Sequence, residues 1–102
     1  MKIITTGHAY ALANFEGETS QFLQFIEKIA PVAGSTELVT INNGTTNEEV
    51  LRVLINRIQY LNGKFPCREN AIVLTKLEES LMWLNKRTED RKARNVEGQA
   101  TA

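Results

Sequence analysis

The sequence has few of the residues that catalysis and metal binding need. Its 102 residues include one cysteine, Cys67, one histidine, His8, and one aspartate, Asp90. Acid, base or nucleophilic catalysis needs such a group beside a positioned partner, and no second partner is recognisable for His8. No Cys or His pair has metal-ligand spacing, and no glycine-rich nucleotide fingerprint is present. The sequence therefore predicts a protein that is not an enzyme and uses no metal or cofactor.

Long hydrophobic runs and net charge are also missing. No stretch approaches the roughly eighteen apolar residues of a membrane-spanning helix, and the N-terminal MKIITTGHAY has no apolar core of signal-peptide length. A single cysteine excludes an intrachain disulfide and favours a reducing compartment. A net charge of zero argues against a general nucleic-acid coat, which needs a broadly positive surface. We expect a cytoplasmic protein that binds no membrane and no polymeric nucleic acid.

The length and composition are those of one globular domain, with 42% hydrophobic and 24% charged residues. The charges are unevenly distributed along the chain. Residues 1–45 carry two basic and four acidic side chains, whereas residues 64–95 carry eight basic and five acidic ones. The sign of the charge therefore reverses, and the basic groups gather near the C-terminal end.

The first part of the chain has the pattern of strands and turns. Short runs rich in Ile, Thr, Phe and Val are separated by glycines and a proline over residues 2–41. Strands are predicted near residues 2–6, 10–15, 21–28 and 37–41. Within the third, residues 22–26 are largely apolar on both faces, so this strand is expected to be covered on both sides.

The second part has the pattern of two helices. Thr46 and Glu49 form a capping-box sequence that predicts a helix start. Gly63 is expected to supply a left-handed exit from this helix, and Pro66 to enforce the break. From about Arg68 no glycine or proline follows until residue 98, which allows a second helix of some seven turns. Two helices joined so tightly predict an antiparallel hairpin.

Together these patterns predict an α+β fold in which a small N-terminal antiparallel β-sheet precedes a long antiparallel two-helix hairpin. We expect a single domain over residues 1–102. Its sheet occupies residues 1–43, its helical hairpin residues 44–95, and a C-terminal tail residues 96–102.

The helices carry more apolar surface than one small core can cover. The predicted core seam of the second helix consists of Asn70, Leu74, Leu77, Leu81 and Leu84. Ile72 and Trp83 project from nearly the opposite side and Met82 from a third direction, while Val53 and Tyr60 lie off the main stripe of the first helix. Apolar groups left over after the core is assigned usually mark an interface, so we expect a homo-oligomer.

The end of the second helix concentrates cations beside an aromatic residue. Arg87, Arg91 and Arg94 are neighbours on one helix surface, with Trp83 one turn before them, and the intervening Asp90 is expected to point elsewhere. One interpretation is a solvated helix C-terminus, where cations are favourable. The other is an anion pocket, because guanidinium groups bind phosphate in a bidentate manner and aromatics stack on bases.

Asn70, at the start of the seam, has two equivalent interpretations. Its amide either bonds the nearby turn or contacts a ligand. Composition and spacing do not separate the alternatives.

Residues 43–98 resemble the hairpin domain of phage and prophage anti-defence proteins that counter Thoeris and CBASS immunity. The motifs that carry the resemblance are C-R-E-N, L-E-E-S-L-M-W-L and K-R-T-x-D-R, and the preceding small sheet resembles the Thoeris-directed branch. One departure is Asn95, where relatives usually have glycine. Asparagine tolerates the left-handed conformation, so the helix cap should survive.

The resemblance implies a signal sponge. Such proteins bind, without cleaving them, the cyclic ADP-ribose isomers made by TIR-domain enzymes, and some also bind cyclic di- or trinucleotides in separate pockets. They act in the cytoplasm of the infected bacterial host cell and assemble as dimers or hexamers with pockets between subunits.

The resemblance also assigns a cyclic ADP-ribose site. Tyr60 would stack on the ligand, Asn70 would make a polar contact, and Arg87 with Arg91 would bind the diphosphate. The additional residues of this predicted site are Arg68 and Lys86.

Two other functions fit the same residues. A small nucleic-acid-binding module would use the arginine stripe on DNA or RNA and would bind in a salt-sensitive way. A structural oligomeric phage protein would use the arginines in salt bridges between subunits and would bind no small molecule.

Overall fold

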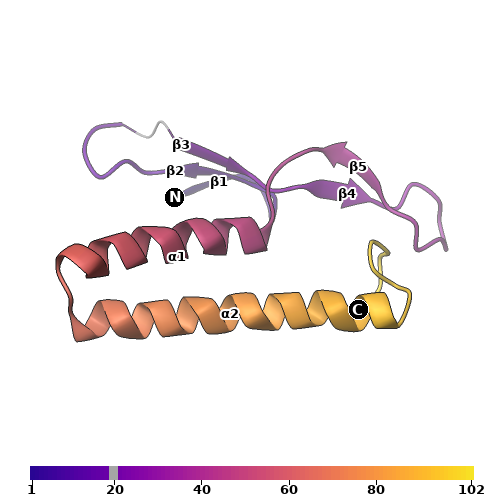
Figure 1. Cartoon of the computed structure of the whole chain (residues 1–102). Coiled ribbons are helices and arrows are strands. Elements are labelled where there is room, and N and C mark those ends of the chain that lie inside the picture. The colour runs from indigo at the N-terminus through magenta and orange to yellow at the C-terminus, as the bar shows by residue number, and fades with distance from the viewer. Residues whose placement is uncertain (19–20) are drawn as a thin grey trace. The chain divides into compact units, whose positions relative to one another are not determined.

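The computed structural model describes residues 1–18 and 21–102. They form two compact units, which are described separately (Figure 1). The sheet unit consists of Met1–Thr46 with Gly98–Ala100, and the hairpin unit of Asn47–Glu97 with Thr101–Ala102. The order of elements, strands first and two helices after them, confirms the predicted α+β fold class.

Three antiparallel strands form the first sheet of the sheet unit. They are β1 (Lys2–Thr5), β2 (Ala9–Leu12) and β3 (Gln21–Gln24), in the spatial order β1-β2-β3. Tyr10 of the central strand pairs with Ile3 on one side and Leu23 on the other. Ala9 and Ala11, both on β2, are the buried apolar residues of the described chain, so the small core of this unit lies at the central strand.

The predicted strand over residues 21–28 is wrong, because the structure divides it between two sheets. After β3 the chain continues into β4 (Glu27–Ile29), which pairs with β5 (Val39–Asn42) in a separate two-stranded antiparallel sheet. Between the two strands the backbone pairs with Thr45 instead, since the Thr45 amide donates to the Gln24 carbonyl (2.9 Å) and the Ile26 amide donates to the Thr45 carbonyl (2.9 Å). These contacts redirect the chain.

The expectation that residues 22–26 are covered on both sides is also wrong for the single chain. Phe22 is 70% exposed. The ring of Phe25 does find a partner, because it packs edge-on against Tyr10 with 6.0 Å between ring centroids. Of the two aromatic side chains in this segment, Phe25 therefore packs within the unit, whereas Phe22 is largely exposed to solvent.

Gly44 allows the backbone crossing beside Thr45. A Cβ atom at this position would lie 2.6 Å from the Phe25 carbonyl carbon and closer still to the Gln24 carbonyl oxygen, and neither backbone atom can give way easily. We expect Gly44→Ala to lower the free energy of unfolding by about 2 kcal/mol, the cost of forcing an extra carbon into a filled space. Urea denaturation measures this change.

Gly63 provides the matched control for that experiment. It lies inside a helix, and a Cβ atom added there would meet nothing within 4 Å beyond the neighbouring residues and backbone of that helix. Gly63→Ala should therefore raise the free energy of unfolding by about 0.5–1 kcal/mol. Equal stability of Gly44→Ala and the wild type would contradict the close backbone approach at Gly44.

The hairpin unit consists of α1 (Asn47–Lys64) and α2 (Arg68–Ala93), which pack side by side (Figure 1). Helix α1 begins one residue after Thr46, as the capping-box sequence predicts. The 26 residues of α2 make about seven turns, which confirms the predicted length. Neither of these helices, nor any other in the described part of the chain, combines the length and hydrophobicity needed to cross a membrane.

The prediction for Gly63 is wrong, because α1 continues through it to Lys64 and its φ angle is not positive. The physical reason lies in the next residues. Pro66 disfavours helical geometry at the residue before it, and the Asn62 side chain accepts a hydrogen bond from the Cys67 amide (3.1 Å). The chain therefore leaves α1 without a left-handed residue, and Cys67 becomes the N-cap of α2.

The end of α2 confirms the expectation for Asn95, which adopts a left-handed conformation with φ of 58°. Its amide donates to the Lys92 carbonyl (3.1 Å), and the amide of Val96 donates to the Arg91 carbonyl (3.0 Å). This pair of bonds is the Schellman arrangement, which satisfies carbonyls at a helix end. The cap reverses the chain direction and sends the tail back toward α2.

The predicted seam of α2 is confirmed in its position, since Asn70, Leu74, Leu77, Leu81 and Leu84 are all half-buried. The surplus apolar groups are exposed, including Tyr60 (55%) and Trp83 (56%). A hairpin with this much exposed apolar surface is consistent with the predicted homo-oligomer, which stays a prediction.

Candidate functional site: a cationic groove on helix α2

A groove of about 200 Å³ lies along the C-terminal half of α2. We call it the cationic groove; its lining residues are Trp83, Lys86, Arg87, Asp90 and Arg94. Residues three or four positions apart on a helix are surface neighbours, so the spacing of this set places it on one face. Three basic side chains, one carboxylate and one indole ring therefore share a single concave surface.

Electrostatic pairing within the groove leaves one guanidinium unengaged. Lys86 Nζ lies 3.7 Å from Asp90 Oδ1, an exposed ion pair of the kind that contributes little to stability. Arg94 Nη2 donates to the Ala102 carbonyl (2.7 Å). Among the described residues, no hydrogen bond or ion pair engages the side chain of Arg87, which is exposed. Arg87 is thus the groove cation most available to an anionic ligand.

Asp90 was expected to point away from the arginines, and the structure corrects this. Asp90 follows Arg87 by three residues and precedes Arg94 by four, so it lies on the same face and lines the groove. Its carboxylate reduces the positive charge there. The helical spacing of Asp90 was the signal that could have revealed its position.

Arg91 lies apart from the groove and is 4% exposed. Its guanidinium holds the C-terminal tail: Nε donates to Glu97 (3.2 Å), Nη2 to the Val96 carbonyl (2.8 Å), and Nη1 to the Thr101 carbonyl. These contacts follow from the helix cap, which turns the chain back over the last turn of α2. The predicted diphosphate contact of Arg91 stays a prediction.

The other predicted site residues lie at the opposite end of the hairpin. Tyr60 is on the last turns of α1, with Lys64 Nζ 4.9 Å from its ring centroid, and Arg68 is the first residue of α2. Asn70 is half-buried, and its backbone amide donates to Cys67 Sγ (3.4 Å). At 1.5 Å per residue, Asn70 and Arg87 are about 25 Å apart along α2. One chain therefore brings together Lys86 and Arg87, but not all six predicted residues.

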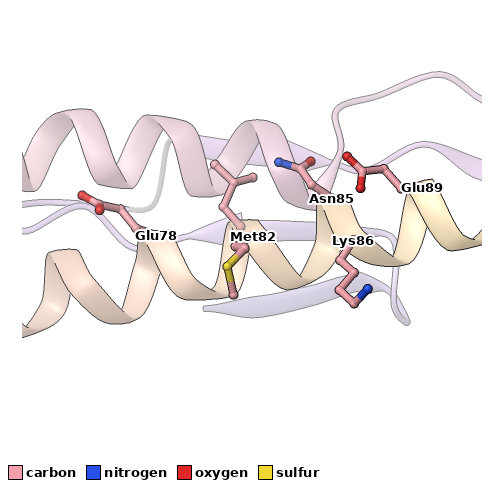
Figure 2. Close-up of a pocket in the computed structure, with 6 residues that line it drawn as sticks. Glu78, Met82, Asn85, Lys86 and Glu89 are labelled. Carbon is pink, nitrogen blue, oxygen red and sulfur yellow. The ribbon is translucent and has the colours of Figure 1, made fainter.

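A second hollow, of about 500 Å³, lies next to the groove on α2. We call it the Met82 face; its lining residues are Glu78, Leu81, Met82, Asn85, Lys86 and Glu89. Figure 2 shows Met82 and Lys86 leaving the helix along one flank, and Glu78, Asn85 and Glu89 along the other. The part of the chain that the structure describes contains no cluster of three His, Cys, Asp or Glu side chains able to hold a metal ion.

The sequence is similar to one known protein family and to a phage protein. The family described as Acb2/Tad1, hairpin domain, matches residues 21–89. Thoeris anti-defense 1 of Bacillus phage SBSphiJ7 is 58% identical over 57 residues, which are 55% of this chain and 40% of that protein. The chain thus spans less than half the length of this curated relative. Because the family match covers more than half of the sequence, the chain belongs to the Acb2/Tad1 hairpin-domain family.

Proposed function

We propose that this protein is a phage anti-defence sponge that binds cyclic ADP-ribose isomers intact and keeps them from their effector. Support comes from the family match and from a relative whose name describes action against Thoeris. The observation that carries the proposal is the cationic groove, in which the unengaged Arg87 lies beside Trp83. Guanidinium suits a diphosphate, and an indole ring suits an adenine.

The groove is open to solvent, so tight binding requires a second copy of the chain to cover it. A sponge that outcompetes an effector needs about nanomolar affinity, or about 12 kcal/mol. Charge-assisted hydrogen bonds reach their full strength only where water is excluded, and a groove on one helix face stays in contact with solvent. A neighbouring copy would cover the groove and desolvate the phosphates.

The positions of the remaining site residues lead to the same arrangement. Asn70 lies about 25 Å from Arg87 along α2. Tyr60 is on the last turns of α1, at the same end of the hairpin as Asn70, so both residues reach a ligand in the groove only from another chain. We therefore propose a pocket between subunits of a dimer or hexamer. Arg87 binds the diphosphate from one copy, and the partner supplies Tyr60, Asn70 and Arg68. Lys86 adds charge beside Arg87.

A release experiment tests the sponge function. The purified protein is mixed with cyclic ADP-ribose isomers and, separately, with cyclic di- and trinucleotides, free ligand is removed, and the protein is heat-denatured. We expect mass spectrometry to detect an unchanged cyclic ADP-ribose isomer in the released fraction. Recovery of no ligand, or of a cleaved product, would contradict a sponge.

The same purified protein is also tested for binding to DNA and RNA. If the arginines served a nucleic-acid-binding module, the protein would retain DNA or RNA and lose it steeply as salt rises. We expect no retention of either polymer at physiological ionic strength, because a net charge of zero gives no general attraction to phosphate chains.

A further inference from the structure

A carboxylate lies within the cationic groove, where the attraction of anions alone does not account for it. Asp90 lines the groove together with Trp83, Lys86, Arg87 and Arg94. Its side chain is 61% exposed and lies 3.7 Å from Lys86, so this ion pair contributes little to stability. A negative charge here repels phosphate and lowers the affinity of the groove for a simple anion. Asp90 therefore either weakens binding or contacts a part of the ligand that is not anionic.

The order of side chains along α2 indicates which part of a ligand Asp90 would meet. Trp83 precedes Arg87 by four residues and Asp90 follows Arg87 by three, which are steps of about 6 Å and about 4.5 Å along the helix axis. A base stacked on Trp83 and a diphosphate bound to Arg87 would place the next part of the ligand at Asp90. In the ADP-ribose isomers a ribose is bonded directly to each phosphate, so its hydroxyls lie close to the diphosphate.

The Asp90 carboxylate suits a ribose hydroxyl. A hydroxyl donates a hydrogen bond and an ionised carboxylate accepts one, and such charge-assisted bonds are about twice as strong as neutral ones. Among the described residues, Lys86 is the side chain paired with Asp90, through Oδ1, which leaves the second oxygen as an acceptor. In dinucleotide-binding folds an acidic residue contacts the ribose 2′-hydroxyl, whereas an arginine accommodates a phosphate. Asp90 and Arg87 offer both kinds of contact on one helix face.

We propose that Asp90 is the specificity-determining residue of the cationic groove, and that its carboxylate accepts a hydrogen bond from a ribose hydroxyl next to the diphosphate. Arg87 attracts the phosphates, and Asp90 makes tight binding depend on a hydroxyl beside them. The groove then prefers a ribosyl diphosphate to a diphosphate without hydroxyls, since only the former offsets the repulsion from the carboxylate. This inference deepens the function proposed above and rests on it.

Asp90→Asn tests the inference, because it removes the charge, keeps the size of the side chain and leaves the backbone hydrogen bond from Arg94 to Asp90 (3.1 Å) in place. Calorimetry measures the binding of inorganic diphosphate and of the cyclic ADP-ribose isomer recovered in the release experiment. We expect the variant to bind the isomer about tenfold more weakly, since it loses a hydrogen bond to a charged group. It should bind inorganic diphosphate about threefold more tightly, since the repulsion is gone. A purely structural role would instead weaken both.

Glu89→Gln is the matched control for this charge change. Glu89 is the preceding residue of α2 and lines the Met82 face, and Figure 2 shows it leaving the helix on the side opposite Lys86. Both affinities should change by less than about twofold in this variant. Equal or tighter binding of the isomer by Asp90→Asn, or diphosphate binding no tighter than in the wild type, would overturn the role of Asp90. A wild type that binds no cyclic ADP-ribose isomer would refute the proposed function itself.

Discussion

Replacing Arg87 with alanine is expected to weaken the binding of a cyclic ADP-ribose isomer about 100-fold while leaving the fold intact. The Arg87 side chain has no hydrogen-bond or ion-pair partner among the described residues, so its removal costs the folded chain little. In the covered groove it would make two charge-assisted bonds to phosphate, worth about 3 kcal/mol together. That energy corresponds to about two orders of magnitude in affinity. Calorimetry of ligand binding, with circular dichroism as the fold check, measures both quantities.

Arg57→Ala is the matched control, because Arg57 is an exposed arginine of α1 outside the groove. It should bind ligand like the wild type. Arg87→Lys should fall between the wild type and Arg87→Ala, since lysine keeps the charge and loses the bidentate geometry. Undiminished affinity of Arg87→Ala would remove the groove from the binding site.

Replacing Arg91 with alanine is expected to lower the stability of the fold strongly. Arg87→Ala, in contrast, should weaken ligand binding and leave the stability nearly unchanged. The buried guanidinium holds Glu97 and the carbonyls of Val96 and Thr101. Its loss would leave these acceptors without their donor, at a cost of about 3 kcal/mol. For a domain of this size, that corresponds to a fall of roughly 10–20 °C in the thermal midpoint. Thermal unfolding followed by circular dichroism gives the value.

The exposed Arg87→Ala variant serves as the comparison, with an expected change in midpoint within about 2 °C. Arg91→Lys should be destabilised as well, because an ammonium group cannot reproduce three bonds made from one planar guanidinium. A thermal midpoint for Arg91→Ala equal to that of the wild type would contradict the role of Arg91 in holding the tail.

These two arginines show where prediction from sequence reached its limit. Four residues apart on a helix, Arg87 and Arg91 look equivalent, and the spacing alone predicts a shared role. The structure separates them because the left-handed Asn95 turns the tail back onto α2 and brings Glu97 to Arg91. The cap itself was predictable from its asparagine. The partner that the returning tail supplies was not, because nothing in the helical pattern encodes it.

In the fold, too, the features set by neighbouring residues were predictable from the sequence, and those set by residues far away in the chain were not. The hairpin was predictable because the capping sequence at Thr46, the break at Pro66 and the leucine seam all act within one or two turns. The division of the strand over residues 21–28 was not, because it depends on Thr45, some twenty residues away, and on the absence of a side chain at Gly44. The exit from α1 was misassigned to Gly63 since Asn62 and Pro66 already end the helix.

Native mass spectrometry of the protein with a cyclic ADP-ribose isomer tests the central claim most directly, because it reports oligomeric state and bound mass together. The account predicts that the ligand is bound to dimers or larger assemblies, with the full mass of the uncleaved ring, and that the Arg87→Ala protein assembles without it. Ligand bound to monomers, or a bound mass showing a hydrolysed ring, would contradict a pocket between subunits that holds the messenger intact.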